Sequence, residues 1–386
     1  MLSQDDRLNI VDIKGVVDAI FSNSEHDKRK QSIANAALGV INSASLIVNR
    51  IGLGLAAAQD LFGKHAIKQV DRLLSNDKFV PGNCFDYYVP YIIGSRKDII
   101  VAMDWTDFDK DKQATITISL ITSHGRATPL IWKTVLKNEL KDKRNDYEDE
   151  VLHKLKDALP GDVHVTVLAD RGFGDTKLYD FLQTDLKFDF VIRFRGNIVV
   201  TDAGGEARAA KDWVGVDGRA KTLRDASVTA QEYNVPMVVC VHAKGMKEAW
   251  CLATSNDQLK ARNIINYYAK RWGIEPQFRD VKDMHFGMGL SNTSIKKPLR
   301  RDRLLLISAI AVVMLTLLGA AGEKLGLDKQ MKVNTVKHRT HSLFRQGCHY
   351  FNKLPRMKVN DAKKIIECFS ELLLEHQNLK SILWVI

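Results

Sequence analysis

Three acidic residues lie where carboxylate oxygens could gather around a metal ion. Asp104 ends the apolar run IIVAMD and Asp170 ends the run VTVLAD, and both runs are typical of β-strands. If these strands are neighbours in a sheet, the two carboxylates repel each other unless a cation lies between them. Glu275 would complete an oxygen-rich site suited to Mg²⁺ or Mn²⁺. Taken singly, an Asp at a strand end is more often a helix cap or a turn residue.

Glu275 belongs to a group of four chemically distinctive side chains on one predicted helix. Tyr268, Arg271, Glu275 and Lys282 follow one another at intervals of three, four and seven residues, so they share one helical face. The acid is therefore accompanied by two cations and a phenol. The simpler interpretation is that Arg271 and Glu275 form a surface ion pair, which contributes about 0.3 to 0.5 kcal/mol.

A predicted α/β sheet would position these residues. Four strand candidates follow one another, and a charged helical stretch at 136–161 separates the second from the third. Strands separated by a helix are typical of an α/β fold. Residues 197–245 are rich in Gly and Ala and predict a β-rich insertion before a further strand at 249–256. The four candidates are residues 98–108, 114–135, 163–174 and 188–200.

The two ends of the chain are predicted to be helical. Residues 1–85 contain apolar residues at helical spacing and no convincing alternation. Their last helix carries Lys64, Lys68 and Arg72 every four residues, which predicts contact with a DNA duplex or, equally, an ordinary solvated basic face. Residues 326–386 are basic and helical.

Composition restricts the class of protein. The chain has 386 residues, 45% of them hydrophobic and 27% charged, which indicates a globular protein of two or three domains. Its net charge of +11 favours a polyanionic partner, with DNA, RNA and an anionic membrane all open. The five cysteines form no C-x-x-C pair and no secretory signal is evident, so we expect a reducing, cytoplasmic compartment without disulfides or a zinc site.

One apolar segment is long enough to span a membrane. Residues 304–322 carry no charge, which meets the length criterion for a transmembrane helix. The segment also contains Ser308 and Thr316 and lies in a strongly basic chain. A buried core helix is therefore the favoured interpretation, and a membrane protein is the alternative.

The helix that carries Glu275 matches a known pattern in full. The stretch YAKRWGIEPQFRDVK contains Y-x2-R-x3-E-x6-K, and it resembles the signature of one branch of bacterial insertion-sequence transposases with a DDE catalytic triad. Similar stretches follow in the family's order from about residue 40 to about residue 340. They are VDRLLSN, MDWTDF, SHGRATPL, LADRGF, RFRGN and WCLATSN.

The resemblance implies a domain organisation built around a ribonuclease-H-like catalytic core. The catalytic domain would span 95–325 and contain the β-rich insertion at 197–245. A helical domain at 1–85 would bind the DNA ends, and the helical C-terminal region at 326–386 is a candidate for dimerisation.

The resemblance also implies the chemistry. Asp104, Asp170 and Glu275 would be the catalytic residues and would bind two Mg²⁺ (or Mn²⁺) ions, which activate a water or a 3′-hydroxyl and stabilise the leaving 3′-oxygen. The enzyme would bind terminal inverted repeats, cleave donor DNA through a hairpin end, and join the 3′-hydroxyl ends to target DNA. Because two ends must be held together, we expect a homodimer on double-stranded DNA, in the bacterial cytoplasm and associated with the nucleoid.

The same resemblance implies DNA contacts around the triad. Tyr268, Arg271 and Lys282 would contact phosphates near the scissile end. Trp250 would stack on a base that is flipped out at the hairpin, a contact that contributes about 1 to 3 kcal/mol. The alternative for Trp250 is a buried strand tryptophan.

Two further cations are assigned from strand alternation. Arg193 and Arg195 flank Phe194 in the run FVIRFRGN, so a strand would place both guanidinium groups on one face. There they would extend the path of basic residues along the DNA.

Two other classes of function remain open beside the transposase. The first is a non-catalytic DNA-binding relative, which the intact triad disfavours. The second is a nuclease of the same fold that cuts without joining, which would need neither the full signature nor Trp250.

Overall fold

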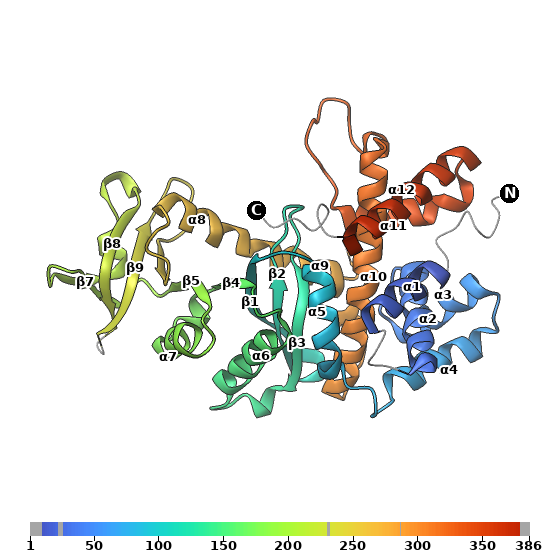
Figure 1. Cartoon of the computed structure of the whole chain (residues 1–386), viewed down its shortest axis with the longest axis horizontal. Helices are drawn as coiled ribbons and strands as arrows, with labels where there is room; N and C mark the ends of the chain where they lie inside the picture. The colour runs from blue at the N-terminus through green and yellow to red at the C-terminus, as the bar shows by residue number, and fades with distance from the viewer. Residues whose placement is uncertain (1–9, 22–25, 230–231, 286, 379–386) are drawn as a thin grey trace.

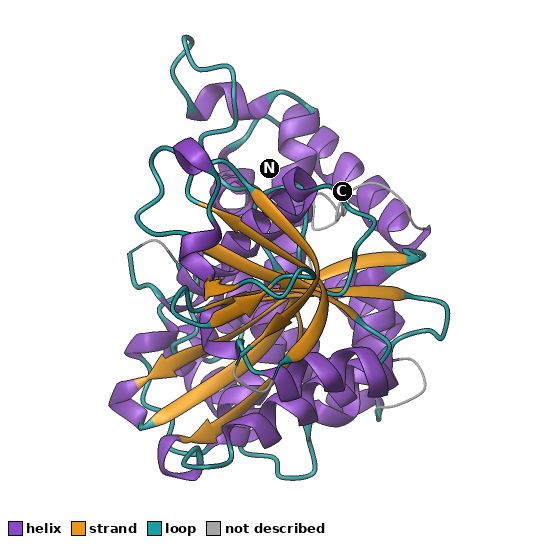
Figure 2. Cartoon of the chain, turned by 90° about the vertical axis from the view of Figure 1, so that its left-hand side faces the viewer, coloured by secondary structure: helices purple, strands orange, loops and turns teal. Residues whose placement is uncertain are grey.

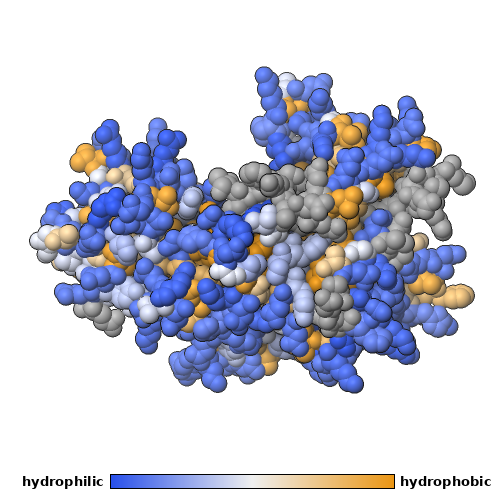
Figure 3. Space-filling view, viewed as in Figure 1, coloured by the Kyte–Doolittle hydropathy of each residue, from blue (hydrophilic) through white to orange (hydrophobic). Residues whose placement is uncertain are grey.

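The computed structural model describes residues 10–21, 26–229, 232–285 and 287–378. One large sheet extends from one end of the molecule to its centre, and the helices of both chain ends gather at the opposite end (Figure 1). Hydrophilic side chains cover most of the face shown in Figure 3, as the charged composition requires.

The N-terminal part of the chain is helical. Its amphipathic α4 buries Ala66, Val70, Leu73 and Leu74 and leaves its basic side chains outside, which is how an apolar stripe is satisfied in a small helical unit. The helices are α1 (Ile10–Phe21), α2 (Asp27–Ser43), α3 (Val48–Gln59), α4 (Gly63–Leu74) and α5 (Phe85–Ile93).

One half of the ten-stranded sheet is a mixed five-stranded unit in the order β3-β2-β1-β4-β5, with β3 at the edge. The first three strands are antiparallel to one another, and β4 and β5 run parallel to β1. Helix α6 (Arg144–Ala158) supplies the crossover between β3 and β4 that a parallel strand requires. The strands are β1 (Asp98–Phe108), β2 (Gln113–Leu120), β3 (Thr128–Leu136), β4 (His164–Ala169) and β5 (Asp189–Phe194).

The structure confirms the limits of the first strand candidate and divides the second. The candidate at 114–135 is two strands rather than one, because a turn in which Gly125 has a φ of 84° reverses the chain between β2 and β3. The candidate at 98–108 is β1, but Asp104 does not end it, since the strand continues to Phe108. Asp104 is therefore inside the strand and pairs with Thr117 of β2.

The segment expected to form a β-rich insertion continues the same sheet. β10 (Trp250–Thr254) pairs antiparallel with β5, and β9, β8, β6 and β7 follow it outward. These strands form the left-hand end of the molecule in Figure 1. Figure 2 views the twisted sheet from that end. Their bounds are β6 (Val199–Thr201), β7 (Ala207–Ala209), β8 (Lys221–Val228) and β9 (Tyr233–Val241).

The helix expected to carry the signature is interrupted. α8 (Ala261–Lys270) and α9 (Ile274–Lys282) are separated by a 3₁₀ turn at Arg271–Gly273. Pro276 lies in the first turn of α9 and has no amide hydrogen to donate to Trp272, so the regular hydrogen-bond ladder cannot continue through this point. A single face for all four signature residues is therefore only approximate.

The apolar segment at 304–322 lies within α10 (Pro298–Lys324), which is long and apolar enough to cross a membrane. However, 83% of its most apolar stretch is buried inside the protein. It packs against α2, β3, α11 (Leu343–Lys353) and α12 (Val359–Asn378). A helix that is apolar all round is expected in such a core position, so the structure favours the core-helix interpretation.

Two buried arginines near the start of α10 connect the N-terminal helices to the sheet. This connection was not apparent from the sequence. The side chain of Arg301 is fully buried and binds Asp111 (2.5 Å) and Gln113 (2.7 Å) beside β2. The guanidinium of Arg303 donates to the carbonyl oxygens of Leu74 (2.9 Å) and Phe79 (2.6 Å). Since buried charges are stable only with such partners, these two arginines fix the helical unit against the sheet.

The crossing of α10 and α11 depends on two glycines. A Cβ atom on Gly319 would overlap the carbonyl oxygen of Leu343, and one on Gly347 would overlap that of Leu315. We expect Gly319→Ala to lower the free energy of unfolding by about 1 to 3 kcal/mol or more, because the helices must separate. Thermal denaturation measures this loss. Gly161→Ala is the control, since its Cβ would meet open space, and an unchanged melting temperature for Gly319→Ala would contradict the close crossing.

Candidate active site

Asp104 and Asp170 are brought together by parallel strand pairing. β1 and β4 are neighbours, and Met103 is in register with Ala169, so the two aspartates follow at equivalent positions. One carboxylate oxygen of Asp104 accepts from the backbone N–H of Trp105 (2.8 Å), and one of Asp170 accepts from that of Gly172 (2.7 Å). Asp170 is thus also the cap of a short turn, which is the ordinary role that a lone Asp at a strand end would have.

Arg271 joins the helical acid to the sheet. Its guanidinium donates to the carboxylate of Asp104 (3.4 Å) and to that of Glu275 (3.3 Å). The arginine side chain is 8% exposed, whereas that of Glu275 is 47% exposed. The arginine is therefore not half of a simple surface ion pair but a buried cation between two acids from different elements.

The electrostatics of these groups show that they act on one another. Burial raises the pKa of Asp104 to about 6, the negative charges of Asp170 and Glu275 add to the rise, and Arg271 opposes it. Burial alone would lower the pKa of Arg271, but Tyr268 and the three acids together raise it. The charges of Asp104, Asp170 and Glu275 therefore act on one another, and together they favour a positively charged group between them.

Two aromatic residues lie next to Arg271, one behind the other. Tyr268 on α8 is 2% exposed, and the guanidinium carbon of Arg271 lies 5.8 Å from its ring centre, within the range of a cation–π contact. Trp250, at the start of β10, meets Tyr268 edge to face at 4.8 Å. The indole is half-buried, so Trp250 is neither a fully enclosed core residue nor an exposed one.

Lys282 lies farther along β1 than the acids. Its ammonium group donates to the Thr106 hydroxyl (2.9 Å) and the Asp107 carbonyl (2.7 Å), and it lies 4.7 Å from the centre of the Phe108 ring. Burial lowers the pKa of Lys282, although the nearby acids Asp107 and Asp109 oppose this. Lys282, the last residue of the signature, therefore makes its hydrogen bonds with β1 and not with Glu275.

Arg193 and Arg195 do not share a strand face. β5 ends at Phe194, so Arg195 lies just beyond the strand, where it is exposed. Arg193 is within the strand and binds the carbonyl oxygen of Ala249 (3.1 Å) and the carboxylate of Glu248 (2.9 Å). It therefore supports the residues that directly precede Trp250.

Lys64, Lys68 and Arg72 are all exposed on the outer face of α4. Lys68 and Arg72 line a surface hollow between α4 and the start of α2. The hollow is also lined by His26, Lys28 and Arg29, which the sequence analysis did not single out. The basic region is therefore broader than one helix.

Trp105, the residue after Asp104, is held by two side chains of α6 that were not singled out from the sequence. The indole N–H of Trp105 donates to Glu148 of α6 (2.8 Å), and the Arg144 guanidinium lies 5.0 Å from the indole ring. Burial raises the pKa of Glu148 to about 7, and the hydrogen bond from Trp105 partly offsets this. The signal in the sequence was Glu148 itself, an acid on the helical face that Leu152 and Leu155 bury.

Carboxylate oxygens are the ligands that Mg²⁺ and Mn²⁺ prefer, and Asp104, Asp170 and Glu275 provide them. Within the described residues, no group of three or more His, Cys, Asp and Glu side chains is gathered closely enough to hold a metal ion. The guanidinium of Arg271 instead supplies the positive charge between Asp104 and Glu275. The donor chemistry of the three acids therefore suits a divalent cation, whereas their arrangement in the described residues is not that of a gathered metal site.

A mixed α/β sheet that carries acids at equivalent positions of two neighbouring parallel strands is consistent with a DDE nuclease fold. The family model of the transposase DDE domain matches residues 96–314 of this chain. The chain therefore belongs to that family, and the protein is a DDE-type transposase that acts on DNA. A comparison with curated proteins found no match.

Proposed function

We propose that this protein is a cut-and-paste transposase of the Y-x2-R-x3-E-x6-K branch. It binds terminal inverted repeats, cleaves donor DNA by hydrolysis and transesterification, and joins the 3′-hydroxyl ends to target DNA. The observation that carries the proposal is the guanidinium of Arg271 held between Asp104 and Glu275. Asp170 lies at the equivalent position of the adjacent strand, so the signature helix and the sheet contribute to one site.

Asp104, Asp170 and Glu275 are the proposed metal ligands. Two divalent ions, Mg²⁺ or Mn²⁺, would supply an activated water or 3′-hydroxyl and a stabilised leaving oxygen. Arg271 offers a planar set of donors that can pass from the carboxylates to a phosphate. Lys282 offers a point charge beside β1 for the adjoining phosphate.

Trp250 and Tyr268 form the proposed support for a hairpin end. The edge-to-face contact between their rings connects Trp250 to Arg271 and thus to the acids. The half-buried indole can offer a stacking surface to a base that leaves the duplex. Arg193 and Glu248 hold the backbone at the start of β10, and the exposed Arg195 extends the basic path.

The proposed domains follow the sequence boundaries. The strand order β3-β2-β1-β4-β5 supports a ribonuclease-H-like core within 95–325, with the insertion at 197–245. Residues 1–85 would bind the DNA ends, and 326–386 would contribute to a homodimer in the paired-end complex. The setting we propose is the bacterial nucleoid.

Pre-cut transposon ends test joining directly. Such ends can be taken from the inverted repeats that flank the gene. We expect the purified protein with Mg²⁺ to insert them into a supercoiled plasmid, because a free 3′-hydroxyl is the nucleophile, and agarose gels resolve the joined products. Ends that terminate in a dideoxynucleotide are the control and should not join. Plasmid cleavage without joined product would favour the plain nuclease, and binding without either would favour the non-catalytic relative.

Salt dependence tests the role of α4. Replacing Lys64, Lys68 and Arg72 together by Gln should weaken binding of the DNA ends and make its logarithmic salt dependence shallower, by about 0.9 for each phosphate that the variant no longer neutralises. Fluorescence anisotropy across a salt titration measures both quantities. The charge-matched control replaces three exposed lysines near the other end of the chain, Lys358, Lys363 and Lys364. Equal slopes for the two triple variants would move end recognition away from α4.

A further inference from the structure

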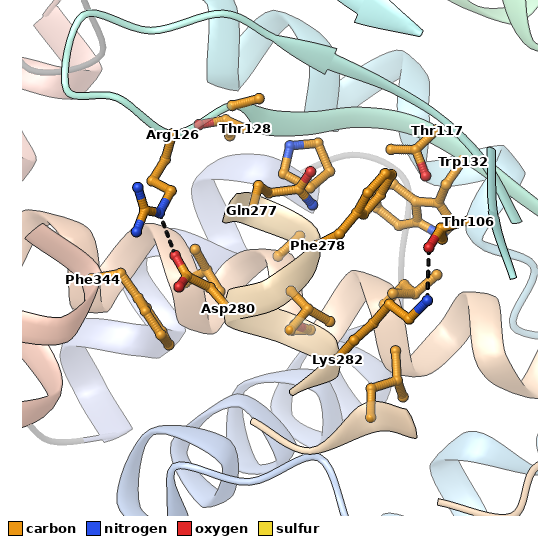
Figure 4. A pocket seen from close by; sticks show the side chains of 18 of the residues that line it. Thr106, Thr117, Arg126, Thr128, Trp132, Gln277, Phe278, Asp280, Lys282 and Phe344 are labelled. Atoms are coloured by element: carbon orange, nitrogen blue, oxygen red, sulfur yellow. Dashed lines mark hydrogen bonds and ion pairs between the residues drawn. The ribbon is translucent and has the colours of Figure 1, made fainter. Parts of the chain in front are cut away.

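A cavity lies between α9, α10 and the inner face of the sheet. Side chains of β1, β2 and β3 form one wall, α9 forms another, and α10 and α11 close it (Figure 4). It leaves about 50 Å³ for the centres of water-sized molecules. A cavity that admits a single water offers the centre of that water almost no freedom to move, so this space can hold a group larger than one water.

Most of the wall is apolar. Phe108, Trp132 and Phe278 contribute aromatic faces, and Val312 and Val313 contribute methyl groups from α10. Walls of this kind favour a ring over a chain of waters, because water in an apolar space lacks hydrogen-bond partners. Small-molecule sites in proteins combine such walls with a few well-placed polar groups.

Three side chains in the wall carry buried polar atoms that have no hydrogen-bond partner within the described residues. They are the side-chain oxygen of Gln277, a residue that is 6% exposed, the hydroxyl of Ser308, a residue that is 1% exposed, and the two ring nitrogens of His124. Figure 4 shows the Gln277 side chain directed into the space beside Phe278. Because buried polar groups are normally paired, these atoms indicate a missing partner with a donor and an acceptor.

The charged groups around the cavity are already engaged. Arg126 binds Asp280 (2.7 Å), and Lys282 binds Thr106 (2.9 Å). The His124 ring also lines the space, and burial, reinforced by Arg339 and Arg126, lowers its pKa to about 4. The imidazole is therefore neutral near pH 7, and the cavity offers only uncharged groups to a ligand.

We propose that this cavity binds a small, neutral ring compound that carries one hydrogen-bonding group, of the phenol or indole class. The O–H or N–H of the ligand donates to the side-chain oxygen of Gln277, and the ring lies against Phe278 and Trp132. In a phenol, the oxygen also accepts from the hydroxyl of Ser308. Binding at this place does not depend on the DNA chemistry, although α9, which would be contacted, carries Glu275.

Calorimetry and thermal denaturation of the full-length protein with phenol, indole and benzene test this site. Phenol and indole should bind and raise the melting temperature, because a ligand of the native state stabilises it. Ser308→Ala should weaken phenol binding by about 2- to 10-fold, the effect of one hydrogen bond, and leave benzene binding unchanged. The matched control is Ser119→Ala, which removes another buried, unpartnered hydroxyl away from the cavity and should alter neither affinity.

Filling the cavity tests its location. Ala309→Leu, from the α10 wall, should abolish binding of all three compounds, and Ser308→Leu replaces it if that variant does not fold. Undiminished phenol binding to the filled variant would place the ligand elsewhere and overturn the proposal. The absence of any binding to the wild-type protein would equally overturn it, since ordered water alone would then satisfy Gln277 and Ser308.

Discussion

Alanine at Asp104, Asp170 or Glu275 will reduce DNA-end cleavage and strand transfer by about a thousandfold or more. Metal ions contribute several kcal/mol to phosphoryl transfer, and each 1.4 kcal/mol corresponds to about a factor of ten. Binding of the DNA ends should remain nearly normal, because these side chains would hold metal and carry no sequence information. Cleavage gels in Mg²⁺, run beside gel-shift titrations with the same DNA, separate the two effects.

The ion pairs of Arg271 require a structural control for these variants. Removing Asp104 or Glu275 leaves the buried guanidinium with one acid fewer, which could disturb the fold. Asp104→Asn and Glu275→Gln keep the shape of the side chains, although Asn keeps only one of the two hydrogen-bond acceptors that Asp104 uses, and both variants should be equally inactive. Asp107→Ala, on the same strand but more exposed, should retain activity. Cleavage at the normal rate by any one triad variant would remove that residue from the assignment.

Replacing Trp250 by Ala should impair hairpin formation by about 5- to 150-fold and leave the first nick nearly unchanged. The range corresponds to the loss of about 1 to 3 kcal/mol of base stacking. In the proposed mechanism only the hairpin step requires the extruded base, so the earlier hydrolysis should not slow. A denaturing gel that resolves nicked and hairpin products measures both steps. Removing the flipped base from the substrate should partly restore hairpin formation, because the cost of unstacking is then absent.

A core tryptophan in a 3₁₀ turn beside the same sheet provides the comparison for Trp250. Trp213 is 6% exposed and donates to the carbonyl oxygen of Val200 (3.1 Å). Trp213→Ala should lower the free energy of unfolding by about 3 to 5 kcal/mol, as the loss of a buried indole does. Trp250→Ala should lower it less, since its indole is half-buried. Equal destabilisation, with nicking and hairpin formation falling in parallel, would return Trp250 to a structural role.

The strands that carry Asp104 and Asp170 could be predicted because the pattern of apolar residues in a strand is a local property of the sequence, whereas their parallel pairing could only be assumed. The place of Asp104 inside β1 rather than at its end was not predicted, because the apolar run stops at this residue and the pairing of Thr106 and Asp107 with β2 is not visible in the sequence. Pro276 indicated that the helix is interrupted between α8 and α9. The regular spacing of the signature residues instead favoured one continuous helix. Pattern alone gives an element's existence more reliably than its limits.

Partners distant in the chain were the main omission. Spacing suggested that Arg271 pairs with Glu275, but nothing in the sequence indicates its second contact with Asp104, 167 residues away. The burial of Arg301 and Arg303 was equally hidden, because a run of arginines is ordinarily a solvated surface. Tertiary packing decides which cations are enclosed, and it is not encoded in any short window of sequence.

The central place of α10 has a consequence for shortened copies of the gene. The helix contacts α2 on one side and α11 and α12 on another, so a product that begins after residue 85 would expose leucine and isoleucine side chains along a 27-residue helix. Such a surface promotes aggregation and degradation. We therefore expect a truncated polypeptide of this kind to be degraded rather than to accumulate as a folded protein.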